Sequence, residues 1–372
     1  MIITLERTGT TDAFIKQLNQ LEHDQRVQSI LLLACDNNGF TTTELDTHLS
    51  QLTKPLFGGI FPEIIHDREK LTTGSILVGI ERPSHVQVIP GLSDPNLDYE
   101  EMIDDTLALK ENVTMFVFVD GFAQRINCLI HDLFSVYGLE FNYIGGGAGS
   151  LSFEQKPCLF TNQGLVQDSA LLVMLEMESG VGVSHGWNEV AGPFKVTESQ
   201  GNVIISLNWK PAFEVYRAVV EQHSKRTFTS NNFFDIAKSY PFGINKLETE
   251  KIIRDPIQVG TDNSLICVGE VPQESFVHIM TGDVDSLVDA AEKALVLSEK
   301  SLSGDSGDKT TLFIDCISRV LFLEDQFERE LQAVSRSGIP LIGALTIGEI
   351  ANSRKDYLEF YNKTSVVGVL QP

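Results

Sequence analysis

One short segment combines residue types that could bind or transform a small molecule. Cys316-Ile317-Ser318-Arg319 directly follows the apolar run 312–315, which reads as a buried strand. Open α/β sheets hold their ligands at the carboxyl ends of such strands. The planar fork of an arginine binds a carboxylate by two parallel hydrogen bonds, so Arg319 is a candidate contact for an anionic ligand. The alternative is that Arg319 pairs with Asp315 or Glu349 and holds the fold.

An acidic turn follows the third strand-and-helix pattern of the chain. Glu349, in Thr346-Ile347-Gly348-Glu349, lies six residues after Gly343, much as Glu63 lies five residues after Gly58. The recurrence makes Gly348 and Glu349 candidate ligand contacts. A repeated turn acid without a ligand is the competing interpretation.

Two side chains could act as nucleophiles, namely Ser184 and Cys316. Ser184 stands in Gly182-Val183-Ser184-His185-Gly186, which matches the nucleophile-elbow pattern by its letters. An elbow needs a helix directly after the serine, whereas Gly186 to Val190 read as strand or loop. An enzyme using either residue therefore remains an alternative, and non-enzymatic function is the expectation.

Other motifs favour structural roles. Gly145 to Ser150 nearly satisfies the dinucleotide fingerprint, but no helix pattern follows to hold a phosphate. We interpret it as a tight turn where the backbone must approach another strand, and a glycine-lined ligand contact is the alternative. The eight histidines include no H-x-x-x-H or H-E-x-x-H pair, so metal binding has no local support.

The elements that must position these residues repeat three times along the chain. Each copy starts with a short apolar run, continues with apolar residues at helical spacing and a glycine-containing run, and ends in another apolar run. The copies occupy residues 30–80, 114–175 and 311–370. We expect an α/β fold of repeated strand-helix-glycine-turn-hairpin units forming two sheet-based domains, residues 1–212 and 213–372, that share one repeat topology.

The composition of the chain argues against two classes of binding partner. The chain has 372 residues, and 28 basic against 51 acidic residues give a net charge of −23, which argues against nucleic acid and against anionic membranes. No apolar run reaches the roughly 18 residues of a membrane span. Five scattered cysteines without C-x-x-C predict reduced thiols, and we expect a cytoplasmic protein.

In combination, several motifs resemble the FIST family of sensory domains, with its N-terminal and C-terminal parts both present. The motifs are His185-Gly186-Trp187, Phe194 to Thr197, Gly201-Asn202, Pro211-Ala212, Tyr216, Tyr240 to Gly243, Arg254-Asp255-Pro256, Gly269-Glu270-Val271, Cys316 to Arg319, Gly348 to Ile350 and Asn362-Lys363-Thr364. One turn departs from the family pattern, because bulky Phe61 and Pro62 stand where small residues are usual. A ligand at that turn is therefore not expected.

The resemblance implies a sensory protein for a small ligand, such as an amino acid or other small carboxylate, that signals to a separate partner such as a histidine kinase. Carried onto this sequence, it marks Arg254, Cys316, Arg319, Gly348, Glu349 and Asn362 as ligand-binding residues. Some bacterial members bind haem and detect nitric oxide, which is the alternative within sensing. A ligand-free adaptor whose acidic surface docks a basic partner is a further alternative.

Overall fold

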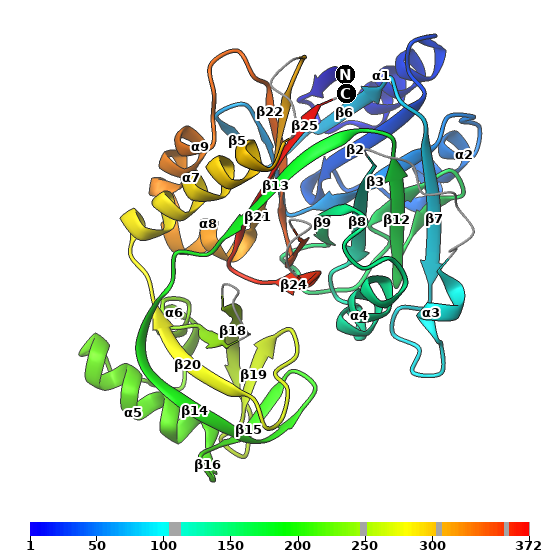
Figure 1. Ribbon diagram of the computed structural model, residues 1–372. Coiled ribbons are helices and arrows are strands. Elements are labelled where there is room, and N and C mark those ends of the chain that lie inside the picture. The colour runs from blue at the N-terminus through cyan, green and yellow to red at the C-terminus, as the bar shows by residue number, and fades with distance from the viewer. Residues whose placement is uncertain (104–112, 246–250, 303–306, 353–356, 372) are drawn as a thin grey trace.

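The computed structural model describes residues 1–103, 113–245, 251–302, 307–352 and 357–371. Its strands form three six-stranded sheets and one seven-stranded sheet, with helices packed against them (Figure 1). The expected α/β class with sheet-based parts is confirmed. Within the described ranges, no helix is both long enough and apolar enough to cross a membrane.

Unit 1 is the first of three repeated units and occupies residues 2–80. Every residue of its central strand is buried, as expected for an apolar run covered on both faces. The first helix buries Phe14, Leu18 and Leu21 on one stripe. Its elements are β1 (Ile2–Glu6), α1 (Thr11–His23), β2 (Ser29–Cys35), α2 (Thr42–Leu49), β3 (Leu56–Phe61), β4 (Glu63–His66), β5 (Glu69–Leu71) and β6 (Ser75–Ile80).

Unit 2 repeats this order over residues 84–175. Its second helix ends where Gly138 takes a positive φ and donates its backbone N–H to Phe134 O, which caps the last turn. Its elements are β7 (Ser84–Pro90), α3 (Tyr99–Met102), β8 (Thr114–Asp120), α4 (Ile126–Tyr137), β9 (Asn142–Ala148), β10 (Leu159–Thr161), β11 (Gly164–Val166) and β12 (Ser169–Leu175).

Unit 3 begins at residue 178 and ends at residue 371, and it is interrupted by an inserted lobe. Its elements are β13 (Glu178–Ser184), α7 (Val284–Ser301), β21 (Thr310–Cys316), α8 (Ile317–Leu323), α9 (Phe327–Ala333), β22 (Leu341–Thr346), β23 (Glu349–Ala351), β24 (Glu359–Tyr361) and β25 (Ser365–Gln371). The lobe joins unit 3 through the connections β13–β14 and β20–α7 and lies to one side of the three sheets (Figure 1).

The lobe occupies residues 188–281. Its strands form a closed antiparallel sheet, because the long strand β14 pairs with β20 in its first half and with β15 in its second half. Its elements are β14 (Asn188–Gln200), β15 (Val203–Leu207), β16 (Lys210–Pro211), α5 (Ala212–Ser224), α6 (Phe233–Ala237), β17 (Phe242–Ile244), β18 (Ile252–Val259), β19 (Leu265–Val268) and β20 (Phe276–Thr281).

The three units share one topology. In each, the central strand pairs in parallel with the strand after the helix, as β2–β3, β8–β9 and β21–β22. The last strand of each unit pairs antiparallel with the other side of the central strand. A Cβ on Gly58, Gly145 or Gly343 would lie 1.9, 1.8 or 2.0 Å from a backbone oxygen of the neighbouring parallel strand. The common topology predicted for the three repeats is confirmed.

The units are joined by exchanging their hairpins in a cycle. The β4–β5 hairpin of unit 1 extends the sheet of unit 3, β10–β11 of unit 2 extends that of unit 1, and β23–β24 of unit 3 extends that of unit 2. The inner strands β3, β9 and β22 contact one another. The three units together, which we call the body, therefore form a ring of three sheets with approximate threefold symmetry.

The predicted boundary at residue 212 falls inside the lobe, at the start of α5. Sheets of the body combine strands from both sides of this position, since β13 pairs with β25 and β9 pairs with β23. A division into 1–212 and 213–372 stays a prediction, and the sheets themselves divide into the three-unit body and the lobe.

Candidate ligand-binding pocket

A pocket of about 490 Å³ lies where unit 2, unit 3 and the lobe meet, and we name it the junction pocket. Unit 2 contributes residues 121–124, 126 and 127, which follow β8 and begin α4, together with Phe153. The lobe contributes Gly201-Asn202, Ile257 and residues 267–270. Unit 3 contributes Ile347 and Phe360. The carboxyl end of a parallel strand and three chain segments distant in sequence thus converge, as is typical of α/β ligand sites.

Two glycines shape the wall of the junction pocket. Gly269 has φ +80, and a Cβ on it would lie 2.9 Å from Arg254 Nε and 3.1 Å from Asn362 Oδ1. Gly348 has φ +85, and a Cβ there would lie 2.2 Å from the ring of Phe360, which lines the pocket. Larger residues at either position would displace the wall, so the predicted site residue Gly348 acts by making room for Phe360.

Arg254 lies directly beneath Gly269 and joins the lobe to unit 3. Its Nε donates to Glu270 O at 2.9 Å, and its Nη1 donates to Phe360 O at 3.1 Å and to Asn362 Oδ1 at 3.3 Å. Burial lowers the pKa of Arg254 to about 10, so the side chain stays charged at neutral pH. Asn362 is buried and its Nδ2 has no hydrogen-bond partner. These two predicted site residues support the pocket from behind.

Glu349 and Cys316 form a second buried pair. Burial raises the pKa of Glu349 to about 8, although hydrogen bonds from Cys316, Thr346 and Thr364 oppose the shift. Burial also raises the pKa of the Cys316 thiol, and the charge of Glu349 adds to this effect. Both groups are therefore neutral at pH 7, and neither supplies a nucleophile or a fixed negative charge.

The side chain of Arg319 is fully buried, and its Nη1 and Nη2 atoms donate hydrogen bonds to protein oxygens. Its Nη1 donates to His185 O at 2.7 Å and Lys363 O at 3.3 Å, and its Nη2 donates to Leu287 O at 3.0 Å and to a carboxylate oxygen of Glu330.

The remaining nitrogen of Arg319, Nε, lies 3.1 Å from Asp315 Oδ1, an ion pair whose angle is too poor for a hydrogen bond. All five donors are thus directed at protein groups. A ligand role for Arg319 stays a prediction, and this geometry favours the alternative in which Arg319 holds the fold.

Ser184 is buried at the end of β13, and a short turn leads from it into β14. The strand–turn–helix of a nucleophile elbow is not formed there, in agreement with the interpretation from the sequence. Gly145 to Gly147 lie within β9, where a Cβ on Gly147 would come 2.2 Å from Ile347 O. The glycines thus serve a close approach of backbones.

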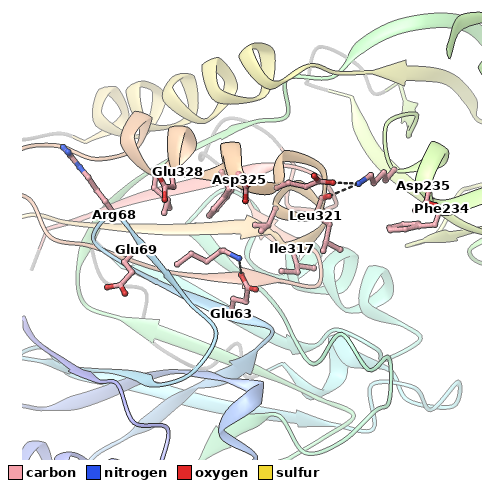
Figure 2. A pocket seen from close by; sticks show the side chains of 15 residues that line it. Glu63, Arg68, Glu69, Phe234, Asp235, Ile317, Leu321, Asp325 and Glu328 are labelled. Carbon is pink, nitrogen blue, oxygen red and sulfur yellow. Dashed lines mark hydrogen bonds and ion pairs between the residues drawn. The ribbon is translucent and has the colours of Figure 1, made fainter. Parts of the chain in front are cut away.

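A larger hollow of about 890 Å³ occupies the corresponding junction between unit 3 and unit 1, bounded by β4–β5, α8, α9 and α6 (Figure 2). Its lining is charged, and acids outnumber bases: Glu63, Glu69, Asp235, Glu324, Asp325 and Glu328 against Arg68, Lys70 and Lys238. Glu63 pairs with Lys70 at 2.7 Å and Glu324 pairs with Lys238 at 3.0 Å. We interpret this hollow as a solvated face, because its lining is charged and two of its three basic residues already form ion pairs with its acids.

None of the six site residues predicted from the sequence lines the junction pocket. Phe122, Phe153 and Asn127 carry no motif, and only the tertiary structure brings them to the lobe. A signal did exist, since Asp120-Gly121-Phe122 occupies in the second repeat the place that Cys316 to Ser318 occupies in the third. Gly201-Asn202 and Gly269-Glu270 also contributed to the family resemblance.

The family comparison covers nearly the whole chain. Residues 28–210 match the FIST N domain, and residues 212–352 match the FIST C domain. No curated protein matches the sequence. The described residues contain no group of three or more histidine, cysteine or acidic side chains that could hold a metal ion.

Proposed function

Because the chain belongs to the FIST family, whose domains are associated with sensory roles in signal transduction, we propose that it binds a small molecule in the junction pocket and signals to a separate protein. The observation that carries this proposal is the composition of the pocket. Its wall combines residues of unit 2, unit 3 and the lobe, so one ligand would contact all three. Its volume of about 490 Å³ suits a metabolite-sized molecule.

Binding at such a place gives a physical route to a signal. A ligand shifts a conformational equilibrium only by its differential affinity for the two states. A molecule that bridges lobe and body stabilises arrangements in which both walls of the pocket are closed. The partner protein, for which a histidine kinase is one candidate, would then recognise the position of the lobe.

Native mass spectrometry tests this proposal directly. We expect freshly purified protein to retain a small mass that is lost on denaturation. Asn127 lies in the first turn of α4 and lines the pocket, so Asn127→Trp should fill the space and abolish retention. His131→Trp, one turn further along α4 at an 81% exposed side chain, is the matched control and should retain the mass. Equal retention in both variants would contradict the proposal.

Haem is the alternative within sensing, and the pocket residues do not fit it. No histidine lines the junction pocket, and its one thiol, Cys267, has a pKa raised far above the ordinary value by burial. A protonated buried thiol is a poor axial ligand. The buried histidine, His278, lies inside the lobe, where its Nε2 accepts a hydrogen bond from Asn245 Nδ2 at 3.0 Å. A Soret band in fresh protein would overturn this conclusion.

An enzyme using Cys316 or Ser184 is the alternative from another class. The burial of both side chains, the neutral state of Cys316 and the absence of a helix after Ser184 weigh against it. The sensory proposal rests on the pocket and on the family to which the chain belongs.

A further inference from the structure

The junction pocket exposes an aromatic ring in a strained backbone conformation. Phe153 is 64% exposed, and its φ of +59 is one that bulky residues rarely adopt. Its ring centroid lies 6.0 Å from that of Phe122, with the two planes tilted by 55°. Both rings line the pocket. Exposure of the ring and strain of the backbone both cost folding free energy, and such strain is common at functional sites. A flat ligand would cover the exposed ring.

The one charged side chain among the described residues of the pocket is a carboxylate, which disfavours an anionic ligand. Its lining contains the amides of Gln124, Asn127 and Asn202, and Glu270 is its only charged residue among those that the structure describes. The carboxylate of Glu270 makes no hydrogen bond or ion pair with a side chain of the described ranges. Among the described residues, no lysine, arginine or histidine lines the pocket. Arg254, whose charge interacts with that of Glu270, lies behind Gly269 with its Nε bonded to a backbone oxygen.

We propose that the junction pocket takes a planar aromatic or heteroaromatic molecule that presents a neutral or cationic N–H donor. Its ring stacks on Phe153 and Phe122, and its donor binds the Glu270 carboxylate. This inference rests on the proposed function and specifies its ligand. It differs from the amino acid or other small carboxylate expected from the sequence, whose carboxylate would meet an acidic side chain here and no cation among the described residues that line the pocket.

Four probes separate ring from charge. Tryptamine and indole-3-acetate share a ring but differ in charge, indole is the uncharged ring, and butylamine is an aliphatic cation without a ring. We expect isothermal titration calorimetry on the full chain to rank tryptamine tightest and indole next. Indole-3-acetate should bind at least about tenfold more weakly than tryptamine, the size of one charge-assisted hydrogen bond. Butylamine should bind about 3- to 10-fold more weakly or worse, because it lacks the ring that stacks on the two phenylalanines.

Two variants assign the contacts. Phe153→Ala changes an exposed side chain, so the fold should survive, and tryptamine and indole should weaken by about 3- to 10-fold, as expected for loss of one aromatic stacking contact. Leu151→Ala, 42% exposed in the same loop, is the matched control and should change nothing. Glu270→Gln should remove the preference for tryptamine over indole-3-acetate. It should weaken indole less than tryptamine, because the amide oxygen of glutamine still accepts from a neutral ring N–H.

Several results would overturn this ligand class. They are indole-3-acetate binding as tightly as tryptamine, butylamine matching tryptamine, no effect of Phe153→Ala, or no binding by any probe. If a retained mass is still lost in Asn127→Trp, only the ligand class fails and the pocket survives. If retention is indifferent to Asn127→Trp, the proposed function fails as well.

Discussion

Replacing Arg319 by methionine should destabilise the fold rather than merely weaken ligand binding. The guanidinium lies between Asp315 and Glu330, with all three side chains fully buried, and it also satisfies three backbone oxygens. Removing one partner from a buried ion pair costs about 3–5 kcal/mol, because the remaining charge stays uncompensated. At 1.4 kcal/mol per tenfold, a loss of about 4 kcal/mol lowers the folded-to-unfolded ratio roughly a thousandfold.

Urea unfolding followed by circular dichroism measures this loss. Arg329→Met is the matched control, because Arg329 pairs with Asp285 at 2.6 Å on the surface, with side chains 45% and 79% exposed. An exposed pair contributes about 0–1 kcal/mol, so the control should unfold almost as the wild type does. Adding Glu330→Leu to Arg319→Met should restore part of the stability by removing one orphaned acid. A change below about 1 kcal/mol in Arg319→Met would refute the reasoning from buried charge.

Three further predictions concern the neighbouring groups. The pKa of Glu349 rises from about 4.5 to about 8 on folding, so the folded state binds an extra proton between these two pH values. The free energy of unfolding should therefore fall as pH rises through that window, and Glu349→Gln should flatten the pH dependence of the urea midpoint. Cys316, buried and protonated, should react with iodoacetamide more slowly than the partly exposed Cys128, and equal rates by mass spectrometry would show an accessible thiolate. The protein should not hydrolyse p-nitrophenyl acetate through Ser184, and an activity abolished by Ser184→Ala would support the enzyme alternative.

The repeated fold was predictable because it depends on local patterns. Apolar runs such as 30–34 specify strands buried on both faces, and stripes such as Phe14, Leu18 and Leu21 specify helices that pack on them. Both patterns recur in the three units, and the equivalent glycines Gly58, Gly145 and Gly343 recur with them. Spacing therefore predicted the order of the elements in the repeats and the topology that the three units have in common.

The cyclic exchange of hairpins was not predictable in this way. The short strands β4, β10 and β23 carry no mark of the partner they join, and each pairs with a strand of a different unit. A hairpin's own sequence sets its turn and its apolar face, whereas the free sheet edge it meets is set by the packing of the whole ring. For the same reason the lobe's position over units 2 and 3 had no local signal.

For the candidate site, too, the sequence and the tertiary structure determined different properties. The sequence by itself determined which residues are chemically capable, including Arg254, Arg319, Glu349 and Cys316, since residue type and strand ends can be read directly. Only the tertiary structure decided that these groups are buried and bonded to other protein groups, leaving Phe153 and Glu270 at the surface of the pocket. The physical reason is that exposure and ion pairing depend on distances between segments far apart in the chain, which residue type and spacing do not encode.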